Sequence, residues 1–166
     1  TGLRVAVSVA QGLAWSQDMP VHGFCSLTAQ GHAAGYQSLL QDGDRVLSTI
    51  DAQINQFYGL WGQWRDGAFV ADGEAFVCAP EDLLAVSSSP ATVVIGSGAR
   101  YQDRIPEELT SASQWLPEVT PDARVMAELL GGGTLALQPE PAHALSPQYV
   151  QLDIGWKKLS EQGRRD

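Results

Sequence analysis

The sequence lacks the features that define secreted and membrane-spanning proteins. No apolar run approaches the roughly 20 residues that span a bilayer, and the opening residues have neither a positive leader nor a signal-peptide cleavage site. Cysteine is rare. Both Cys25 and Cys78 lie in apolar runs, which favours buried free thiols in a reducing cytosol over a disulfide. We therefore expect a cytoplasmic protein without membrane contact.

Basic residues are also scarce. Ten Lys and Arg stand against 19 Asp and Glu, which gives a formal net charge of −9. Binding to nucleic acid needs clustered cations that neutralise phosphates, so this balance argues against strong direct contact with nucleic acid. The exception is a C-terminal group, for which a solvated tail is the simpler interpretation: Lys157, Lys158, Arg164 and Arg165.

Common catalytic motifs are missing. The chain has no G-x-S-x-G nucleophile elbow, no C-x-x-C pair, no P-loop and no H-E-x-x-H. Its three histidines, His22, His32 and His143, are scattered, and none has a metal-ligand partner at helical spacing. The residues therefore predict no metal site and no bound cofactor.

Two positions remain open to a functional or a structural interpretation. Asp51 ends an apolar strand-like run, where it is either a catalytic acid or an acceptor for amides of the following turn. Gly96 and Gly98 follow another apolar run, but Tyr101 replaces the third glycine of a nucleotide fingerprint and no convincing helix follows. We favour a structural turn for both positions.

The elements that are present alternate between helix and strand, which indicates an α/β protein. Asp66-Gly67 is the strongest hairpin signal, and the neighbouring aromatic residues (Phe57, Tyr58, Trp61 and Trp64) fit a strand in the core better than a helix. Thr120 is the expected N-cap of a helix through Leu130. The remaining elements are expected as a helix from residue 2 to Asp18, a strand at 20–27, a helix at 26–43, strands at 45–70, 74–79 and 91–98, a short helix from Pro80, a linker at 138–147 and a last strand or short helix at 148–159.

The first helix has an unusual composition. Gly2, Ala6, Ala10 and Ala14 lie four residues apart and so share one face, which lets another backbone approach closely. The other positions are mostly Leu and Val with only a narrow polar edge. A helix that is apolar nearly all round is normally covered on several sides. We expect the protein's own sheet on one side and a second protein on another.

The order of several motifs resembles a known family. The stretches "TGLRVAVSVAQGLAWSQDMPVHGFCSLTAQ", "IDAQINQFY", "GSG" after an apolar strand and "YVQLDIGWKKL" resemble, in sequence order, the bacterial TsaB (YeaZ) family of tRNA threonylcarbamoyladenosine biosynthesis proteins. The chain departs from the family pattern at Gln53 and Gln56, where Arg and Glu are usual, and at residues 151–153, where an Arg-containing run is usual. Any role of those charged residues is not carried over.

The resemblance implies a two-lobed, actin-like ATPase (ribonuclease H-like) fold. It places residues 1–43 in the remnant of the first lobe, residues 44–139 in the second lobe, and residues 140–166 in a proline-rich linker and C-terminal segment. It also implies that the family's first strands and first helix, about a quarter of its length, are not in this sequence.

The resemblance further implies a non-catalytic subunit. TsaB pairs with its paralogue TsaD, joined by the ATPase TsaE, for threonylcarbamoyl modification of the adenosine next to the tRNA anticodon. The metal-binding histidines of TsaD correspond here to Ser26 and Gln30, which are poor metal ligands. The resemblance thus predicts a TsaD heterodimer, a homodimer when the protein is alone, and contact with tRNA only through the complex.

The predicted partner interface is the small-residue face of the first helix with its flanking apolar residues: Gly2, Leu3, Ala6, Val7, Ala10 and Ala14. The alternative function is a glycoprotease-like metallopeptidase acting on partner proteins. A kinase-like nucleotide-binding protein would need an Asp-x-Gly hairpin to hold phosphate, and "IDAQIN" has no glycine there.

Overall fold

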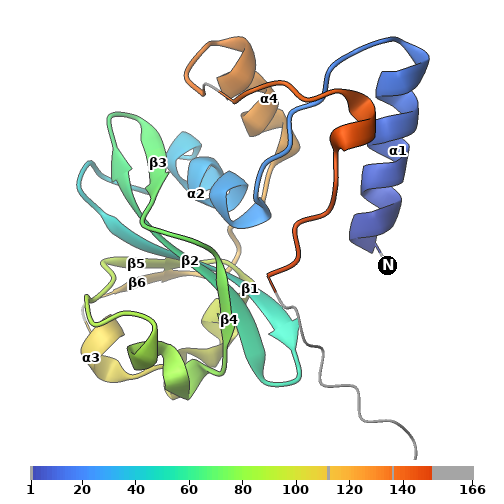
Figure 1. The fold of residues 1–166 in the computed structure, drawn as a ribbon. Coiled ribbons are helices and arrows are strands. Elements are labelled where there is room, and N and C mark those ends of the chain that lie inside the picture. Colours follow the sequence, from blue (N-terminus) through green and yellow to red (C-terminus); the bar gives the residue numbers. More distant parts are fainter. Residues whose placement is uncertain (1, 112, 136, 151–166) are drawn as a thin grey trace, which may run out of the picture.

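A mixed β-sheet with helices on both faces forms the body of the protein, and one helix stands apart from it (Figure 1). The computed structural model describes residues 2–111, 113–135 and 137–150. The α-helices are α1 (Gly2–Ser16), α2 (Ser26–Tyr36), α3 (Glu107–Thr110) and α4 (Ala123–Gly131), and the 3-10 helices are η1 (Pro80–Ala85), η2 (Ser97–Arg104) and η3 (Ala142–Ala144). The strands are β1 (Arg45–Gln53), β2 (Gln56–Arg65), β3 (Ala68–Ala71), β4 (Phe76–Cys78), β5 (Val93–Ile95) and β6 (Gln114–Leu116).

The sheet combines an antiparallel half with a parallel half. Its order is β3-β2-β1-β5-β6, and β4 also pairs with β2. The pairs of β2 with β1, β3 and β4 are antiparallel, whereas β1, β5 and β6 run parallel to one another. The carboxyl ends of β1, β5 and β6 therefore meet at one edge, where α/β proteins usually place their ligands.

Two hairpin turns connect the antiparallel strands. The predicted turn at Asp66-Gly67 is confirmed, with φ of +50° and +77°, which is the pattern of a two-residue type I′ turn. The β1–β2 turn follows Asp51, where the sequence favoured a turn. It carries three consecutive residues with positive φ, Gln53, Ile54 and Asn55, and none of them is glycine. The four aromatic residues between the turns lie in β2, as expected.

Each face of the sheet has its own apolar core. On one face α2, with α4 beside it, packs over β1, β2 and β5, and the cluster includes Leu27, Ala34 and Val46. On the other face η1, η2 and α3 cover a cluster that includes Leu47 and Phe57. The sheet is thus buried on both sides, which explains the continuous apolar runs of its parallel strands.

The small residues of α2 let it lie close to the sheet. A Cβ atom added at Gly31 would lie 2.4 Å from the Phe69 ring, and one at Gly35 would lie 2.0 Å from the Trp64 ring. Larger side chains at these two positions would push the helix away from β2 and β3.

The expected strand at residues 20–27 is wrong. Only Val21 pairs there, in a single bridge with Glu140, and α2 already begins at Ser26. Residues 20–25 connect α1 to α2, and within the described residues no strand of the sheet pairs with them, although Cys25 and Leu27 pack against the core. Helix α2 also ends earlier than predicted, at Tyr36 rather than near Gly43.

Other boundaries also differ from the sequence-based expectation. Asp122, not Thr120, caps α4, because its carboxylate accepts the amides of Arg124 and Val125. The short helix from Pro80 is a 3-10 helix, and the 3-10 helix η2 follows the Gly96 turn, where none was expected. Helix α3 and strand β6 were not predicted. The last predicted element, at 148–159, lies mostly outside the described residues.

The described residues contain no helix that is long and apolar enough to cross a membrane. The division into lobes after residue 43 stays a prediction. The contact that bears on it is the packing of α2 on β1, β2 and β3, which joins residues before and after that boundary.

Candidate partner interface

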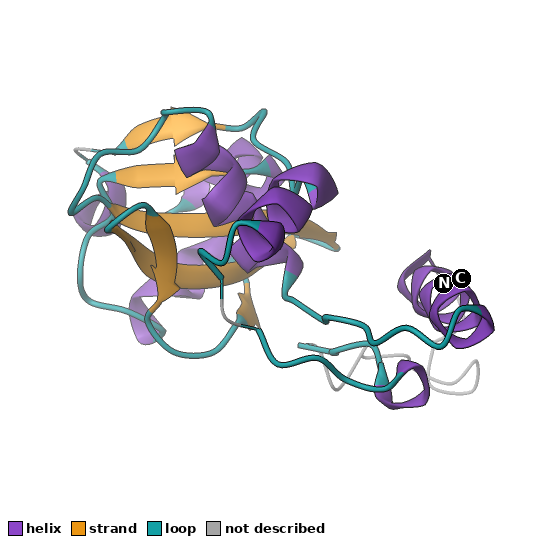
Figure 2. Ribbon diagram, turned by 90° about the horizontal axis from the view of Figure 1, so that it is seen from above, coloured by secondary structure: helices purple, strands orange, loops and turns teal. Residues whose placement is uncertain are grey.

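Helix α1 carries the main exposed apolar surface of the described chain. Figure 2 shows it beside η3 and at a distance from the sheet. More than half of the large apolar side chains that are exposed in the described residues lie in α1 or just after it: Leu3, Val5, Val9, Leu13, Trp15, Met19 and Phe24. The expectation that this helix is covered by the protein's own sheet and on several sides is therefore wrong for the described structure. Apolar surface concentrated in this way is typical of an interaction site.

One face of α1 is covered, by the segment around η3. Ala14 is buried, Val7 and Ala10 are half-buried, and the Gln11 side-chain amide donates a hydrogen bond to the Leu145 carbonyl at 2.9 Å. At the start of the helix, Arg4 Nε donates to the hydroxyl of Tyr149 at 2.7 Å. Contacts across more than 130 residues of sequence thus attach the last described segment to this helix.

The opposite face of α1 is free in the described structure. Val5, Val9 and Leu13 are 56%, 55% and 65% exposed, and they repeat every fourth residue. Gly2 and Ala6 lie beside them and are also exposed. We call these five residues the outer face of α1.

The residues of the predicted interface lie on two different sides of α1, one exposed and one covered. Gly2, Leu3 and Ala6 are exposed, whereas Val7, Ala10 and Ala14 turn toward the η3 segment. The predicted set does not include the exposed residues Val5, Val9 and Leu13. The signal that could have found them is their own four-residue spacing, about a third of a turn from the small-residue face.

Known proteins match the chain over almost its whole length. The tRNA threonylcarbamoyladenosine biosynthesis protein TsaB of Haemophilus influenzae is 30% identical over 173 residues, which cover 96% of this chain and 68% of that protein. The chain belongs to the TsaB family. The protein of the same name from Escherichia coli is 25% identical over 96% of this chain and 69% of its own length. Residues 1–84 also match the family described as "TsaD: tRNA N6-adenosine threonylcarbamoyltransferase".

Solved structures share the fold of this chain. A Pseudomonas aeruginosa protein described as uncharacterized, with similarity to peptidase YEAZ, matches with a TM-score of 0.74 at 24% identity, over 89% of this chain and 67% of that one. YeaZ from the same organism matches with a TM-score of 0.69, also at 24% identity. These likenesses confirm the predicted α/β, actin-like fold of the TsaB family.

The structure places Ser26 and Gln30, which the resemblance matched to metal ligands of TsaD, in two different environments. Ser26 is exposed at the start of α2. Gln30 is buried, and its Nε2 donates to Ser48 Oγ at 3.1 Å, to the Thr49 carbonyl at 3.1 Å and to the Ile95 carbonyl at 3.3 Å. Gln30 therefore joins the ends of two parallel strands at the edge where a ligand would be expected.

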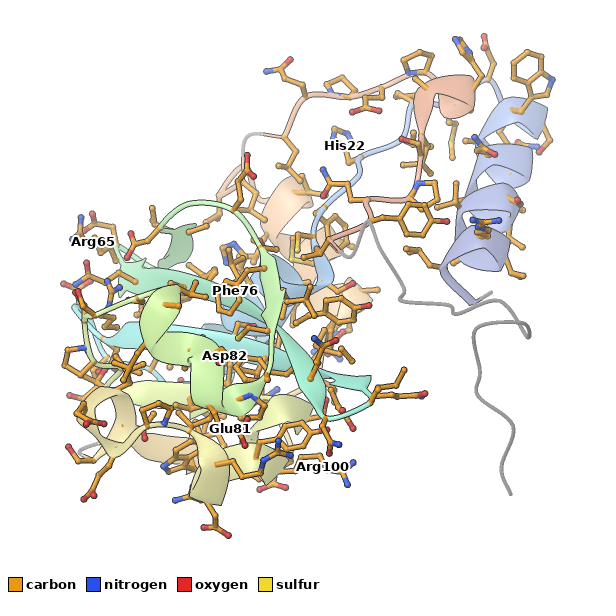
Figure 3. The ribbon with its side chains drawn as sticks, turned by 60° about the horizontal axis from the view of Figure 1, so that its bottom comes forward. His22, Arg65, Phe76, Glu81, Asp82 and Arg100 are labelled. Atoms are coloured by element: carbon orange, nitrogen blue, oxygen red, sulfur yellow. The ribbon has the colours of Figure 1, made fainter. Side chains whose placement is uncertain are left out.

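The histidines do not come together. His22 lies in the connection between α1 and α2 (Figure 3), and His143 stacks edge-on against Trp15. His32 is buried in α2, where its Nδ1 accepts the amide of Phe69 at 3.4 Å, and burial lowers its pKa. No group of three or more His, Cys, Asp or Glu that could hold a metal occurs among the described residues.

The structure favours the turn interpretation of Asp51. Its carboxylate accepts the amide of Gln53 at 3.0 Å, the hydroxyl of Tyr101 at 2.9 Å and the guanidinium of Arg100 at 2.8 Å, while its own amide donates to Ser97 Oγ. Partial burial raises the pKa of Asp51, but these hydrogen bonds outweigh it and hold the pKa below its ordinary value. An acid that stays ionised and fully bonded is suited to holding a turn.

Arg104 forms a second clasp next to the first clasp, in which Asp51 binds Arg100 and Tyr101. Arg104 binds both carboxylate oxygens of Glu81 and also Asn55, so it joins η2 to η1 and to the β1–β2 turn. Figure 3 shows Glu81 and Arg100 at the same end of the body, far from α1. These charged groups are paired with one another and do not add to the α1 surface.

The glycine motif after β5 is a structural turn, as favoured from the sequence. Gly96 has φ +90° and ψ −178°, and a Cβ there would lie 2.1 Å from both Gln30 Nε2 and the Thr49 carbonyl. Glycine is needed because this backbone region and this close approach exclude a side chain.

Proposed function

We propose that this TsaB-family chain is a non-catalytic subunit in the biosynthesis of threonylcarbamoyladenosine in tRNA, and that it pairs with TsaD through α1. TsaE joins the assembly, the subunit contacts tRNA only through the complex, and it acts in the cytoplasm. The observation that carries the pairing is the exposed outer face of α1. In this proposal the same face forms a homodimer when TsaD is absent.

The chemistry of the outer face suits a partner helix. Burying the remaining exposed half of Val5, Val9 and Leu13 would contribute roughly 1 kcal/mol for each side chain. Gly2 and Ala6 leave room for a second backbone to come close. The face is apolar and carries no charge, so it fits an apolar helix and not a nucleic acid.

A non-catalytic role is supported by the residues at the edge of the parallel strands. Gln30 uses its amide to bind backbone carbonyls, and Asp51 is committed to the β1–β2 turn. Neither is available as a metal ligand or a general base. The peptidase alternative rests on the description of one solved structure as similar to peptidase YEAZ, and a stoichiometric transition metal in the purified protein would favour it.

The pairing is tested by charge substitutions on two faces of α1. Val9→Lys, on the outer face, should weaken binding to TsaD more than a hundredfold in isothermal titration calorimetry, because an unpaired buried charge costs about 3 kcal/mol. Ser8→Lys is the matched control on an exposed polar position of the same helix, and it should bind as the wild type does. Circular dichroism confirms that each variant is folded.

A third variant tests the interface first expected from the sequence. Ala10→Lys places the charge on the half-buried side toward η3. If Val9→Lys stays folded and binds TsaD with wild-type affinity, the outer face is not the interface. Loss of binding in Ala10→Lys alone would return the interface to the small-residue face.

A further inference from the structure

A groove lies at the C-terminal end of α1, separate from the outer face. It forms where the end of the helix, the following turn and the segment before η3 meet, and it has a volume of about 720 Å³. We call it the α1-end groove, and its main lining residues are Trp15, Asp18, Met19, Pro139, Glu140 and His143. A hollow of this size can hold a long side chain of a partner protein.

The walls of the groove are apolar and aromatic. Trp15 is 70% exposed, and His143 meets it edge-on with ring centroids 6.5 Å apart. Met19 is 54% exposed, and Pro139 is also exposed. Such walls accept the methylene stem of a long side chain, and the face of an exposed indole attracts a cation.

Two carboxylates from distant parts of the chain lie at this groove. Asp18 follows α1, and Glu140, whose backbone pairs with that of Val21 through two hydrogen bonds of 2.8 Å, lines the same groove. Within the described residues neither carboxylate has an ion-pair or hydrogen-bond partner, and no Lys or Arg lines the groove. The groove is therefore negative as well as apolar.

Both the backbone conformation and the negative charge of Asp18 are unfavourable at the end of α1. The amide of Met19 bonds to the Ala14 carbonyl and that of Asp18 to the Trp15 carbonyl, so Asp18 occupies the left-handed position of a Schellman cap, with φ +50°. Glycine or asparagine normally fills that position. A negative charge there also faces the negative end of the helix dipole, and the last turn of α1 has no basic residue. A cation bound in the groove would relieve this repulsion.

We propose that the α1-end groove binds an arginine side chain of the protein that docks on α1. This inference rests on the proposed function, because the partner is the one that covers the outer face. Arginine fits better than lysine, since its planar guanidinium stacks on an indole and can bind a carboxylate through two nitrogens. The negative charge of the groove opposes any phosphate-bearing ligand.

The test uses a pair of small probes that differ mainly in charge. N-acetyl-L-arginine amide carries the guanidinium, and N-acetyl-L-citrulline amide is its neutral analogue of nearly the same shape. The indole N–H signal of Trp15 is followed by NMR and is assigned among the five tryptophans with Trp15→Phe. We expect the arginine probe to bind roughly tenfold more tightly than the citrulline probe.

The double variant Asp18→Asn/Glu140→Gln removes both charges from the groove. It should lose the preference for the arginine probe, and Asp18→Asn alone should raise the urea midpoint of unfolding because asparagine suits the cap. Glu107→Gln/Glu108→Gln, on the exposed start of α3, makes the same change in net charge and should keep the preference. Equal affinity for the two probes, or a preference that survives in the groove variant, overturns the inference.

Binding to TsaD separates this inference from the proposed function. The groove variant should weaken that complex about tenfold and reduce its dependence on salt, whereas Val9→Lys should weaken it more than a hundredfold. If Val9→Lys weakens binding to that extent but the groove variant matches the wild type at every salt concentration, only the groove inference fails. If Val9→Lys binds normally, the proposed function fails, whatever the small probes show.

Discussion

Replacing Gly96 with alanine should destabilise the protein more than replacing any freely placed glycine. Gly96 lies at φ +90°, ψ −178°, a region that residues with a side chain almost never adopt, and the strain costs roughly 1–3 kcal/mol. The new Cβ would also lie 2.1 Å from Gln30 Nε2 and 2.1 Å from the Thr49 carbonyl oxygen. One of those atoms belongs to the backbone of β1, so the contact cannot be relieved by a side-chain rotation alone.

The second part of the cost comes from the hydrogen bonds of Gln30. If the alanine displaces the Gln30 amide, that buried amide loses its partners and the Thr49 carbonyl loses a donor, which costs roughly 1–3 kcal/mol, whereas the Ile95 carbonyl keeps the hydroxyl of Thr49 at 2.6 Å. Together the two effects give a loss of about 4 kcal/mol in the free energy of unfolding. That is a large part of the total stability of a domain of this size.

The assay is urea unfolding followed by tryptophan fluorescence, with Gly67→Ala as the matched control. Gly67 also has a positive φ, +77°, but nothing lies within 4 Å of an added Cβ, so its substitution should cost only about 1 kcal/mol. In a Gln30→Ala background, Gly96→Ala should cost less than in the wild type, because the contact with the amide is already gone. Equal unfolding midpoints for Gly96→Ala and Gly67→Ala would refute the reasoning.

Three further predictions concern charge. Because burial lowers the pKa of His32 in the folded state, the unfolded chain binds a proton at this residue more readily than the folded chain does. The free energy of unfolding should therefore fall as the pH drops below the ordinary histidine pKa of 6.5. The variant His32→Leu should not show this fall in urea titrations between pH 7.5 and 5.5. The lowered pKa of Asp51 has the same sense in a more acidic range: its stabilisation is present above the ordinary pKa of 3.8 and is lost as the pH falls through the lower folded-state pKa. Asp51→Asn should cost about 1–2 kcal/mol at pH 7, and an unchanged unfolding midpoint would show that the clasp to Arg100 and Tyr101 contributes nothing. The isolated protein should bind tRNA only weakly at physiological salt, because its net charge is −9, and a submicromolar dissociation constant by filter binding would contradict this.

Local signals in the sequence were enough for the elements whose structure depends on near neighbours. Asp66-Gly67 predicted its hairpin because both residues tolerate a positive φ. The spacing of small and apolar residues predicted α1, and the aromatic alternation predicted β2. The order of the motifs also indicated the TsaB family, and membership of that family implied the fold.

Where local signals were weak or contradictory, the sequence misled. The run at residues 20–27 has a strand-like composition, but a strand forms only where another strand can receive its hydrogen bonds, and here only Glu140 is available. The β1–β2 turn has three positive φ angles and no glycine. The local bond from the Gln53 amide to Asp51 is joined there by contacts of Asp51 and Asn55 with η2, which lies about 50 residues further along the chain.

The sequence by itself determined that α1 is an apolar helix with a face of small residues and that Ser26 and Gln30 make a poor metal site. The first follows from residue types at fixed spacing, and the second is what the resemblance to the TsaB family implies. Only the tertiary structure decided which side of α1 is free, because the segment near η3 that covers Ala10 and Ala14 lies about 130 residues further along the chain. The α1-end groove has the same origin: Asp18 and Glu140 become neighbours through a backbone bridge, and no spacing pattern in the sequence records a contact of that range.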